Sequence, residues 1–499
     1  MISKDEALAG DKLLRRVEKL TSILEVAKAM TAQRDLDRLL AIILTEAAKV
    51  VDADRCSLFI VDRERSELWT KVAHGTKEIR IPLGTGIAGH VAAAGETVNI
   101  LDAYEDPRFN RSVDLATGYR TRNILCVPMR DAHGQVTGVI QALNKAHDSF
   151  TSEDEELLLA LGGQAAAAIE NALLHEEINR LFEGFVNASV VAIESRDPTT
   201  AGHSGRVATL TVGLAESLEH VTLGRYAGVR FNREDINEIR YASLLHDFGK
   251  VGVREPVLVK AEKLYPFEVE MMKMRFEVIK ARLEAESYKR QVQLILDKGT
   301  PEAARIVEEE GQKLTQSMKE LDEILEFIMG CNRPTVLARG GFERLTEIGA
   351  RMVPDGRGGN RNLLTSHEVA VLSIPRGSLS EVERKEIESH VTWTFKFLSQ
   401  IPWTRALRRV PNIAYAHHEK LDGKGYPRAL PADEIPVQSR MMAIADIYDA
   451  LTASDRPYKK AVPHDLAMDI LRKESEGGQL DKELFTIFVE AKVSDRLRK

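Results

Sequence analysis

The sequence predicts a multidomain protein. An α+β domain is followed by a coiled-coil-like connecting helix and then by an all-α helical bundle with a helical-hairpin insertion. The chain has 499 residues, more than one hydrophobic core usually holds. Short apolar or alternating runs between turn residues dominate residues 57–144, whereas helical spacing of apolar residues dominates from about residue 186. The fold class therefore changes between these two regions.

The composition is that of a globular, acidic protein. Hydrophobic residues make up 43% and charged residues 29% of the chain, and the formal net charge is −7. Such a chain has no general attraction for nucleic acid or anionic lipid, so we expect no DNA partner. The three cysteines show no C-x-x-C spacing, which argues against disulfides and thiolate metal sites. No signal core or membrane-spanning run is evident, so we expect a cytoplasmic protein without a membrane span.

The first domain is expected over residues 20–170, after an N-terminal helix over residues 1–19. Apolar residues at helical spacing predict an amphipathic helix within residues 16–50. Five strands follow, each bounded by Gly, Asp or Asn turn signals. They are predicted over residues 57–61, 67–73, 96–101, 124–129 and 138–144.

A connecting helix is predicted over residues 171–190. Leu174, Ile178, Leu181 and Phe185 follow one another at steps of four, three and four residues. This spacing is typical of a coiled-coil seam. We therefore expect the helix to carry the chain from the first domain into the second.

The second domain is expected over residues 191–499. Two long helices are predicted within it, over residues 266–297 and 301–329, joined by the residues DKGT. Pro301 occupies a favourable first helical position, and the second helix carries a continuous apolar stripe. The two helices are expected to form a helical hairpin, and residues 276–380 are interpreted as an insertion in the bundle.

Residues 20–175 resemble a GAF domain. The resemblance is carried by DPRFNRSVDLATGYRTRNILCVPM (106–129) and by the pattern of Asn144, Lys145, Phe150 and Asp154 seen in cyclic-nucleotide-type GAF domains. In that family the lysine and the aspartate form a salt bridge that shapes the pocket. The resemblance implies a sensor of a small ligand, such as a cyclic nucleotide, and a homodimer. Many GAF domains bind no nucleotide, and that alternative stays open.

Histidines and aspartates are grouped in the second domain. Imidazole nitrogens and carboxylate oxygens together suit first-row transition metals, and the absence of thiolates argues against structural zinc. Because adjacent helical residues point about 100° apart, His246 and Asp247 cannot bind one ion in the same way. The two oxygens of an aspartate can instead bridge two ions, which predicts a dinuclear centre. The residues in question are His203, His246, Asp247, His390, His417, His418 and Asp446.

The second domain resembles an HD-GYP domain, a cyclic di-GMP phosphodiesterase family among the HD metallohydrolases. The matching motifs occur in family order: GHSGRV (202–207), HDFGKVGV (246–253), His390, HHEKLDGKGYP (417–427), IADIYDAL (444–451) and RPYKK (456–460). The resemblance implies that one metal takes His203, His246, Asp247 and Asp446. The second would take Asp247, His390, His417 and His418. Iron or manganese is favoured, and zinc, nickel and cobalt stay open.

Two departures from the family pattern affect the ligand set. Some members bind a third metal through a glutamate that corresponds here to Thr199, so we expect two metals. The family's third histidine corresponds by spacing to Arg275, which cannot ligate a metal. The pattern returns in SLSEVERKEIESH (378–390), where Leu379 precedes His390 by the same spacing as Leu264 precedes Arg275. We interpret His390 as the ligand after the insertion; the alternative is that the centre lacks it.

The resemblance implies hydrolysis of cyclic di-GMP to pGpG and/or GMP by a metal-activated hydroxide, under control of the GAF domain. Asp247 and Lys250 are the expected catalytic residues, and Lys250, Tyr426, Arg456 and Lys459 the expected substrate contacts. A diguanylate cyclase (GGDEF) domain is a further partner that the family suggests. Two alternatives stay open: an inactive receptor of a cyclic dinucleotide or of a partner protein, and cyclic GMP-AMP as the substrate.

Overall fold

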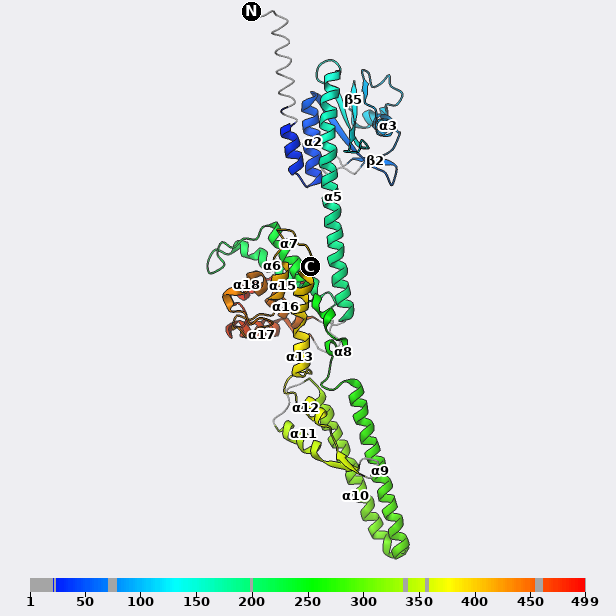
Figure 1. The fold of residues 1–499 in the computed structure, drawn as a ribbon, viewed down its shortest axis with the longest axis vertical. Coiled ribbons are helices and arrows are strands. Elements are labelled where there is room, and N and C mark those ends of the chain that lie inside the picture. Colours follow the sequence, from blue (N-terminus) through cyan, green and yellow to red (C-terminus); the bar gives the residue numbers. More distant parts are fainter. Residues whose placement is uncertain are drawn as a thin grey trace, which may run out of the picture. The chain divides into compact units, whose positions relative to one another are not determined.

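The fold is described from a computed structural model. It covers residues 21, 24–70, 79–197, 201–334, 340–354, 359–453 and 461–498. The chain divides into two compact units, Met1–Gly184 and Phe185–Lys499. The first unit contains a sheet with helices and the second is mostly helical, which confirms the predicted fold class (Figure 1). The N-terminal helix predicted over residues 1–19 lies outside the described residues.

The first unit is built on a six-stranded antiparallel sheet in the order β3-β2-β1-β6-β5-β4. All five predicted strands are present. Strand β3 was not predicted, because four residues are too few to establish an alternating pattern. The strands are β1 (Ala53–Asp62), β2 (Glu67–Thr70), β3 (Ile79–Pro82), β4 (Val98–Ile100), β5 (Ile124–Arg130) and β6 (Val136–Lys145).

Helices cover both faces of this sheet. Leu125, Val127 and Met129 of β5 point to a core shared with α2 (Leu36–Val50) and α5 (Ser152–Arg196). The alternate residues Ile124 and Cys126 belong to a second core with α3 (Gly86–Ala94), as expected where successive side chains of a strand point to opposite faces. A short helix, α4 (Arg111–Thr117), precedes β5.

Helix α5 runs without interruption through the predicted connecting segment. It has 45 residues, which corresponds to a length of about 68 Å. The predicted seam residues Leu174, Ile178, Leu181 and Phe185 are all exposed. By length and composition alone this helix could cross a membrane, but half of its most apolar 18-residue stretch is buried within the protein.

The helices of the second unit form a bundle around the grouped histidines. Helix α6 packs against α7 and α16, and α15 packs against α7, while α14 packs on the short 3-10 helix η3. The main elements are α6 (His203–Ser217), α7 (Arg233–Leu245), η3 (Phe248–Gly252), α14 (His390–Leu398), α15 (Val410–Tyr415), α16 (Val437–Thr452), α17 (His464–Glu476) and α18 (Lys482–Glu490). Shorter elements are η2 (Leu218–His220), α8 (Glu255–Leu258), α13 (Glu381–Glu388), η4 (Ala432–Glu434) and η5 (Val493–Arg498).

The predicted helical hairpin is formed by α9 (Pro266–Lys298) and α10 (Thr300–Asn332), seen in Figure 1 as two long adjacent helices. Both helices begin with proline in their first turn, and Gly299 at positive φ joins them. The segment continues through α11 (Gly341–Ala350), the two-stranded pair β7 (Met352–Pro354) and β8 (Asn360–Asn362), and α12 (Ser366–Leu372). These elements share a hydrophobic core of their own.

A buried ion pair joins the segment before this insertion to the segment after it. Lys260 Nζ, before α9, lies 2.7 Å from Glu383 Oε1 of α13, and the Tyr265 hydroxyl donates to the same carboxylate at 2.6 Å. Burial alone would raise the pKa of Glu383, but the hydrogen bonds from Lys260 and Tyr265 lower it to about 2. The carboxylate therefore stabilises the fold fully above its ordinary pKa of 4.5, and loses this contribution as the pH falls from 4.5 toward 2.

We expect Glu383→Gln to lower the free energy of unfolding by about 2 kcal/mol at pH 7, because it leaves Lys260 buried without its counter-charge. The difference from wild type should shrink as the pH approaches 2. Thermal unfolding across this pH range measures it. Glu381→Gln, on an exposed position of the same helix, is the control and should behave as wild type at every pH. A difference that does not depend on pH would contradict this account of Glu383.

Candidate metal centre

The seven predicted metal ligands come from separate elements and lie together in the second unit. His203 is the first residue of α6, and His390 is the first residue of α14. His246 and Asp247 follow the end of α7, His417 and His418 follow α15, and Asp446 lies in the middle of α16. All of them are buried except His418, which is partly exposed. Helix ends thus direct most of these side chains toward one point.

Asp247 lies at the centre of the group. Its Oδ2 atom is 3.6 Å from His203 Nε2 and 3.5 Å from His246 Nε2, while Oδ1 is 3.3 Å from His390 Nε2. Asp446 Oδ1 is 3.3 Å from His203 Nε2. The two oxygens of Asp247 therefore face two different groups of histidines, which is the geometry of a bridging carboxylate.

Ligand atoms in the group are close enough to share metal ions. Three sets have their donor atoms within 4.8 Å of one another. The sets are His203, His246 and Asp247; His246, His417 and Asp446; and His390, His417 and His418. The first and third sets correspond to the two predicted ions.

The histidine rings are oriented from behind by backbone carbonyls. Nδ1 of His246, His390 and His417 each lies 2.6–2.7 Å from the carbonyl oxygen three residues earlier, that of Ser243, Ile387 and Ala414. This contact leaves Nε2 as the free acceptor, as in metal-binding histidines generally. Among the described residues, the Nε2 atoms of these three histidines are buried and have no hydrogen-bond partner.

Three buried ring nitrogens without partners are costly unless an ion binds them. The donor set of imidazole and carboxylate, without thiolate, suits divalent transition metals. The residues present therefore fit a metal centre, and this fit rests on the buried Nε2 atoms.

The protonation states of His246, His417, His418 and Asp247 also suit a metal. Burial lowers the pKa of all three histidines. The pKa of His246 is lowered, that of His417 lies well below its usual range, and that of His418 falls to about 3. These rings are therefore neutral near pH 7. Burial would raise the pKa of Asp247, but the positive charge of Lys250 holds it well below its usual range. Neutral imidazole and ionised carboxylate are the forms that bind metals.

Asp449 is an outer partner of the centre that the sequence did not single out. It accepts a hydrogen bond from His203 Nδ1 at 2.7 Å and another from Arg206 Nε at 2.6 Å. Burial would lower the pKa of His203, but hydrogen bonds to Asp446 and Asp449 raise it to about 9. The signal was available, since Asp449 lies three residues after Asp446 on one helix and so on nearly the same face.

We expect Asp449→Asn to weaken metal binding by about 10- to 100-fold, because an amide holds the His203 ring less firmly and does not support its basicity. Competition with a chelator of known affinity measures the loss. Asp469→Asn, an exposed position that pairs with Arg472, is the control. Equal metal affinity in the two variants would remove Asp449 from the site.

Gly249 and Thr394 join the halves of the centre that the insertion separates in sequence. A β-carbon at Gly249 would overlap the carbonyl oxygen of His390, so only glycine permits this approach of η3 to α14. Gly249 N donates to Thr394 Oγ1 at 2.8 Å, and Thr394 Oγ1 donates to the His246 carbonyl at 2.9 Å. These contacts hold His390 beside His246.

Lys250 lies at the edge of the group. Its Nζ is 2.8 Å from Asp247 Oδ2 and 3.4 Å from Asp197 Oδ2. Burial would lower the pKa of Lys250, but these two carboxylates raise it, so the ammonium stays charged. Asp197 was not predicted from the sequence. The ammonium has three donors, and these two carboxylates are its acceptors among the ion pairs of the described residues.

The loop after the paired histidines is held by Glu419, which the sequence did not single out. Its buried carboxylate accepts from the backbone N–H groups of Arg428 and Leu430 at 2.8 and 2.9 Å. This fold places the Tyr426 ring 4.7 Å from the His418 ring, over the least buried histidine of the group. Arg456 and Lys459, the other expected substrate contacts, lie outside the described residues, as does Thr199.

Arg275 lies in the insertion and takes no part in the centre. Its guanidinium is paired with Glu368 of α12 at 2.8 Å and donates to the Leu363 carbonyl at 2.9 Å. His390 occupies the place among the ligands that the sequence assigned to it. The alternative in which the centre lacks this ligand is therefore disfavoured by the geometry.

The four GAF-motif residues of the first unit form a cluster of largely buried contacts. Lys145 Nζ is 2.8 Å from Asp154 Oδ1 and also donates to the Val51 carbonyl, with Phe150 buried beside it. Asn144 is buried, has positive φ, and accepts from Arg122 N. These contacts tie the end of β6 to the start of α5.

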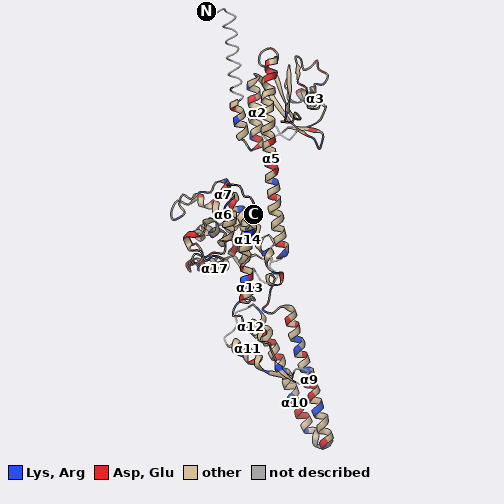
Figure 2. Cartoon of the chain, in the orientation of Figure 1, with Lys and Arg blue, Asp and Glu red and all other residues tan. Residues whose placement is uncertain are grey.

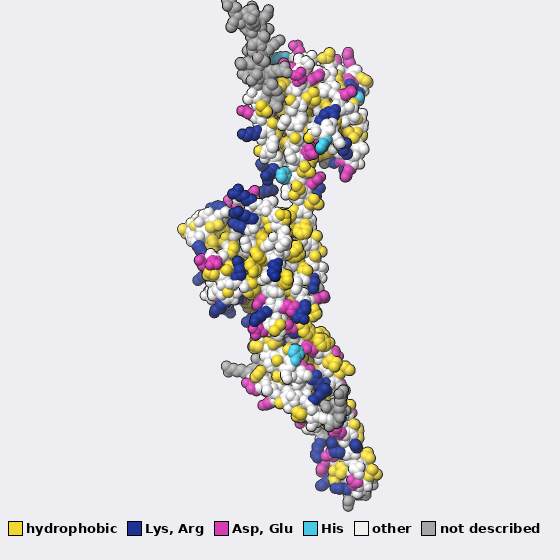
Figure 3. All heavy atoms as spheres, viewed as in Figure 1, with side chains coloured by type: hydrophobic (Ala, Val, Ile, Leu, Met, Phe, Trp, Pro, Cys, Tyr) yellow, Lys and Arg dark blue, Asp and Glu magenta, His cyan; other side chains and the backbone are white. Residues whose placement is uncertain are grey.

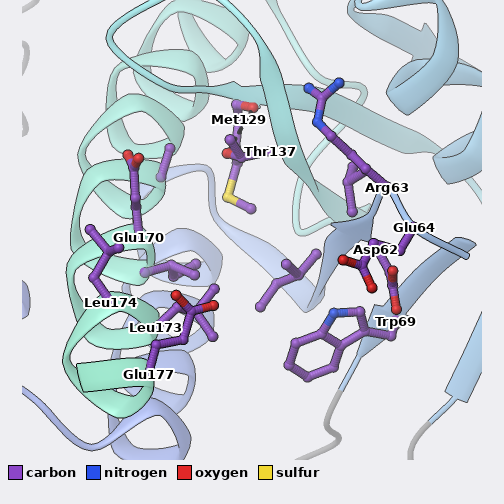
Figure 4. A pocket seen from close by; sticks show the side chains of 14 residues that line it. Asp62, Arg63, Glu64, Trp69, Met129, Thr137, Glu170, Leu173, Leu174 and Glu177 are labelled. Atoms are coloured by element: carbon purple, nitrogen blue, oxygen red, sulfur yellow. Dashed lines mark hydrogen bonds between the residues drawn. The ribbon is translucent and has the colours of Figure 1, made fainter. Parts of the chain in front are cut away.

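A cavity of about 450 Å³ lies on the face of this sheet that α5 covers, between β1, β2 and α5 (Figure 4). Trp69, Met129 and Leu173 line it, and Glu170 and Glu177 of α5 stand at its edge. None of the four GAF-motif residues is among its lining residues.

Comparison with known proteins agrees with this division of the chain. Residues 35–169 match the GAF domain family, and residues 200–328 and 365–484 each match an HD domain family. The two HD matches lie on either side of a gap within the insertion. His203, His246 and Asp247 fall in the first match, and His390, His417, His418 and Asp446 in the second. Both matches therefore contribute candidate ligands to one cluster.

Curated relatives match a limited part of the chain. A probable 3′,5′-cyclic phosphodiesterase, pde-5, of Caenorhabditis elegans is 38% identical over 29% of this chain and 22% of its own length. A dual 3′,5′-cyclic-AMP and -GMP phosphodiesterase 11A of Takifugu rubripes is 41% identical over 30% of this chain and 18% of its own. The chain thus spans about a fifth of the length of these relatives.

Among solved structures, the GAF domain of a phosphoenolpyruvate-protein phosphotransferase from Coxiella burnetii is 23% identical. The match covers 32% of this chain and 98% of that domain, with a TM-score of 0.30. The family matches and the converging ligands lead to one conclusion. The chain carries a GAF domain followed by an HD-type metallohydrolase domain.

Proposed function

We propose that this protein is a cytoplasmic, metal-dependent phosphodiesterase of the HD-GYP type that opens cyclic di-GMP to pGpG and/or GMP under control of its GAF domain. The observation that carries the proposal is the arrangement around Asp247. Three buried histidine nitrogens without a hydrogen-bond partner in the described part of the chain converge with both oxygens of this carboxylate beside the charged Lys250. Two divalent ions, iron or manganese by preference, would be held there.

The chain's own residues prepare this site for a phosphodiester. When bound, the ions would supply a water nucleophile at neutral pH and neutralise charge on the phosphate. The backbone carbonyls behind His246, His390 and His417 fix the direction of each ring before any ligand binds. Lys250 adds a fixed positive charge that would attract a phosphate oxygen. A protein nucleophile is not needed.

The preference for a cyclic dinucleotide rests on the ordered motifs and on Tyr426. The Tyr426 ring stands over His418, where it is placed to stack on a base of the substrate. The relative from Takifugu rubripes is named as a phosphodiesterase of cyclic AMP and cyclic GMP, so these two nucleotides are the competing substrates. A cyclic nucleotide at the GAF domain, a homodimer and a diguanylate cyclase (GGDEF) partner belong to the same proposal.

Purified protein loaded with iron or manganese tests the proposal directly. It is incubated separately with cyclic di-GMP, cyclic GMP-AMP, cyclic AMP and cyclic GMP, and the products are separated by chromatography. We expect pGpG or GMP to appear from cyclic di-GMP fastest. Faster turnover of another cyclic nucleotide would overturn the proposed substrate. No turnover of any of them, with binding retained, would favour the receptor alternative.

A further inference from the structure

Helix α9 of the insertion has two apolar faces. One face, with Val269, Met272, Phe276 and Ile279, is buried in the core that α9 shares with α10. The opposite face is exposed although it is also apolar. Phe267, Met271, Met274 and Val278 are 59–67% exposed. A helix that is apolar on both sides is usually covered on both sides.

The exposed face follows a heptad repeat along nearly the whole helix. Its residues alternate at steps of four and three, and all of them are exposed. Such a stripe is about 42 Å long and has the 3.5-residue period of a coiled-coil seam. The residues are Phe267, Met271, Met274, Val278, Ala281, Ala285, Tyr288, Val292 and Ile295.

Helix α10 lacks such a second face. Its apolar residues, among them Leu321, Ile324 and Ile328, lie in the shared core. No large hydrophobic side chain of α10 is exposed among those the structure describes. Figure 3 shows hydrophobic side chains on the surface over the start of α9, and Figure 2 shows charged residues of both signs along the hairpin. The exposed stripe therefore belongs to α9 alone and is not a general property of the hairpin.

We propose that this stripe pairs with the same stripe of a second copy of the chain, as a parallel, in-register, two-stranded coiled coil. The charges beside the stripe indicate which partner helix covers it. One edge carries Glu270, Glu277 and Glu284, and the other carries Arg275, Arg282 and Lys289. In a parallel pair each glutamate faces the residue five positions later on the partner. All three glutamates then face a cation.

An antiparallel pair would place the acidic edges together and the basic edges together, which is repulsive. Arg275 is already engaged by Glu368, so the direction is set by Glu277 with Arg282 and by Glu284 with Lys289. Arg282 pairs with Glu286 of its own helix but is only partly buried, and Lys289 is exposed. Self-complementary charge therefore favours a second copy over an unrelated helix.

A cysteine at Val278 tests the pairing in the full-length protein. In the parallel, in-register pair the two copies of residue 278 face each other, so mild oxidation should link most Val278→Cys chains into dimers on a non-reducing gel. The native Cys126 and Cys331 are buried and Cys56 is half-buried, so wild type should stay largely unlinked. Gln316→Cys, exposed on α10, is the matched control and should also stay unlinked. Equal cross-linking of the two variants would overturn the proposal.

Charge variants in the Val278→Cys background test the seam and its direction. Met274→Glu with Ala281→Glu should reduce cross-linking at least tenfold, whereas Gln312→Glu with Gln316→Glu on α10 should leave it unchanged. Glu277→Lys with Glu284→Lys should weaken the link, and adding Arg282→Glu with Lys289→Glu should restore it. Insensitivity to the first pair, or no restoration by the last, would contradict the parallel seam. Hydrolysis plays no part in these readouts, so this inference and the proposed function can fail separately.

Discussion

Asp247→Asn is expected to lower metal-dependent phosphodiester hydrolysis by more than about 1000-fold, and to reduce the metal content of the purified protein. The substitution keeps the size of the side chain and one acceptor oxygen but removes the negative charge. Both oxygens of Asp247 face histidines, Oδ2 toward His203 and His246 and Oδ1 toward His390. An amide cannot bridge two cations through two oxygens, so both ions lose a ligand together.

Initial rates with saturating iron or manganese, together with metal analysis of the same preparation, measure this effect. Asp322→Asn is the matched control, since Asp322 is exposed on α10 and pairs with Lys280. Its rate and metal content should equal those of wild type. An Asp247→Asn variant that retains two metals and more than a tenth of the activity would show that Asp247 is not the bridge.

His390→Ala is expected to lower activity by more than about 100-fold and to remove one of the two ions, because this ring faces the Oδ1 side of Asp247. Arg275→Met should behave differently. Its loss leaves Glu368 buried without a counter-charge, which should destabilise the insertion by about 3 kcal/mol but leave the metal content unchanged. The two variants therefore distinguish His390, the candidate ligand, from Arg275, which only occupies the sequence position where the family has its histidine.

Metal analysis and thermal unfolding of the two variants make this comparison. His367→Ala, which removes an exposed histidine of the insertion, controls for the loss of an imidazole. Loss of metal on Arg275→Met with no loss on His390→Ala would reverse the assignment. That result would also contradict the interpretation of residues 276–380 as an insertion that divides the site.

The grouping of the candidate ligands could be predicted because each lies in a short motif whose chemistry is local. The HD pair and the HH pair identify themselves by residue type, and the repeated spacing before His390 predicted where the chain returns after the hairpin. The hairpin was predicted for a similar reason, since its apolar stripe and its proline and glycine signals are all local.

The outer partners could not be predicted in the same way. Glu419 and Thr394 act through side-chain directions that only the packed bundle defines, and single polar residues of these types occur throughout the sequence. Asp449 is the exception, because its spacing from Asp446 on one helix was a usable signal. Strand β3 was missed because it is short and largely exposed. The exposed stripe on α9 was missed because its residues are interleaved with the buried stripe, so the helix reads as broadly apolar rather than as two faces.

The most direct test of the central claim is the number of divalent ions bound per chain, measured by elemental analysis after loading with iron or manganese and removal of excess metal. The claim is that ligands from both sides of the insertion hold one dinuclear centre. It predicts two ions per chain in wild type, fewer than two in His203→Ala and in His390→Ala, and two in His367→Ala. Two ions retained in both His203→Ala and His390→Ala, or no ion in wild type, would contradict it.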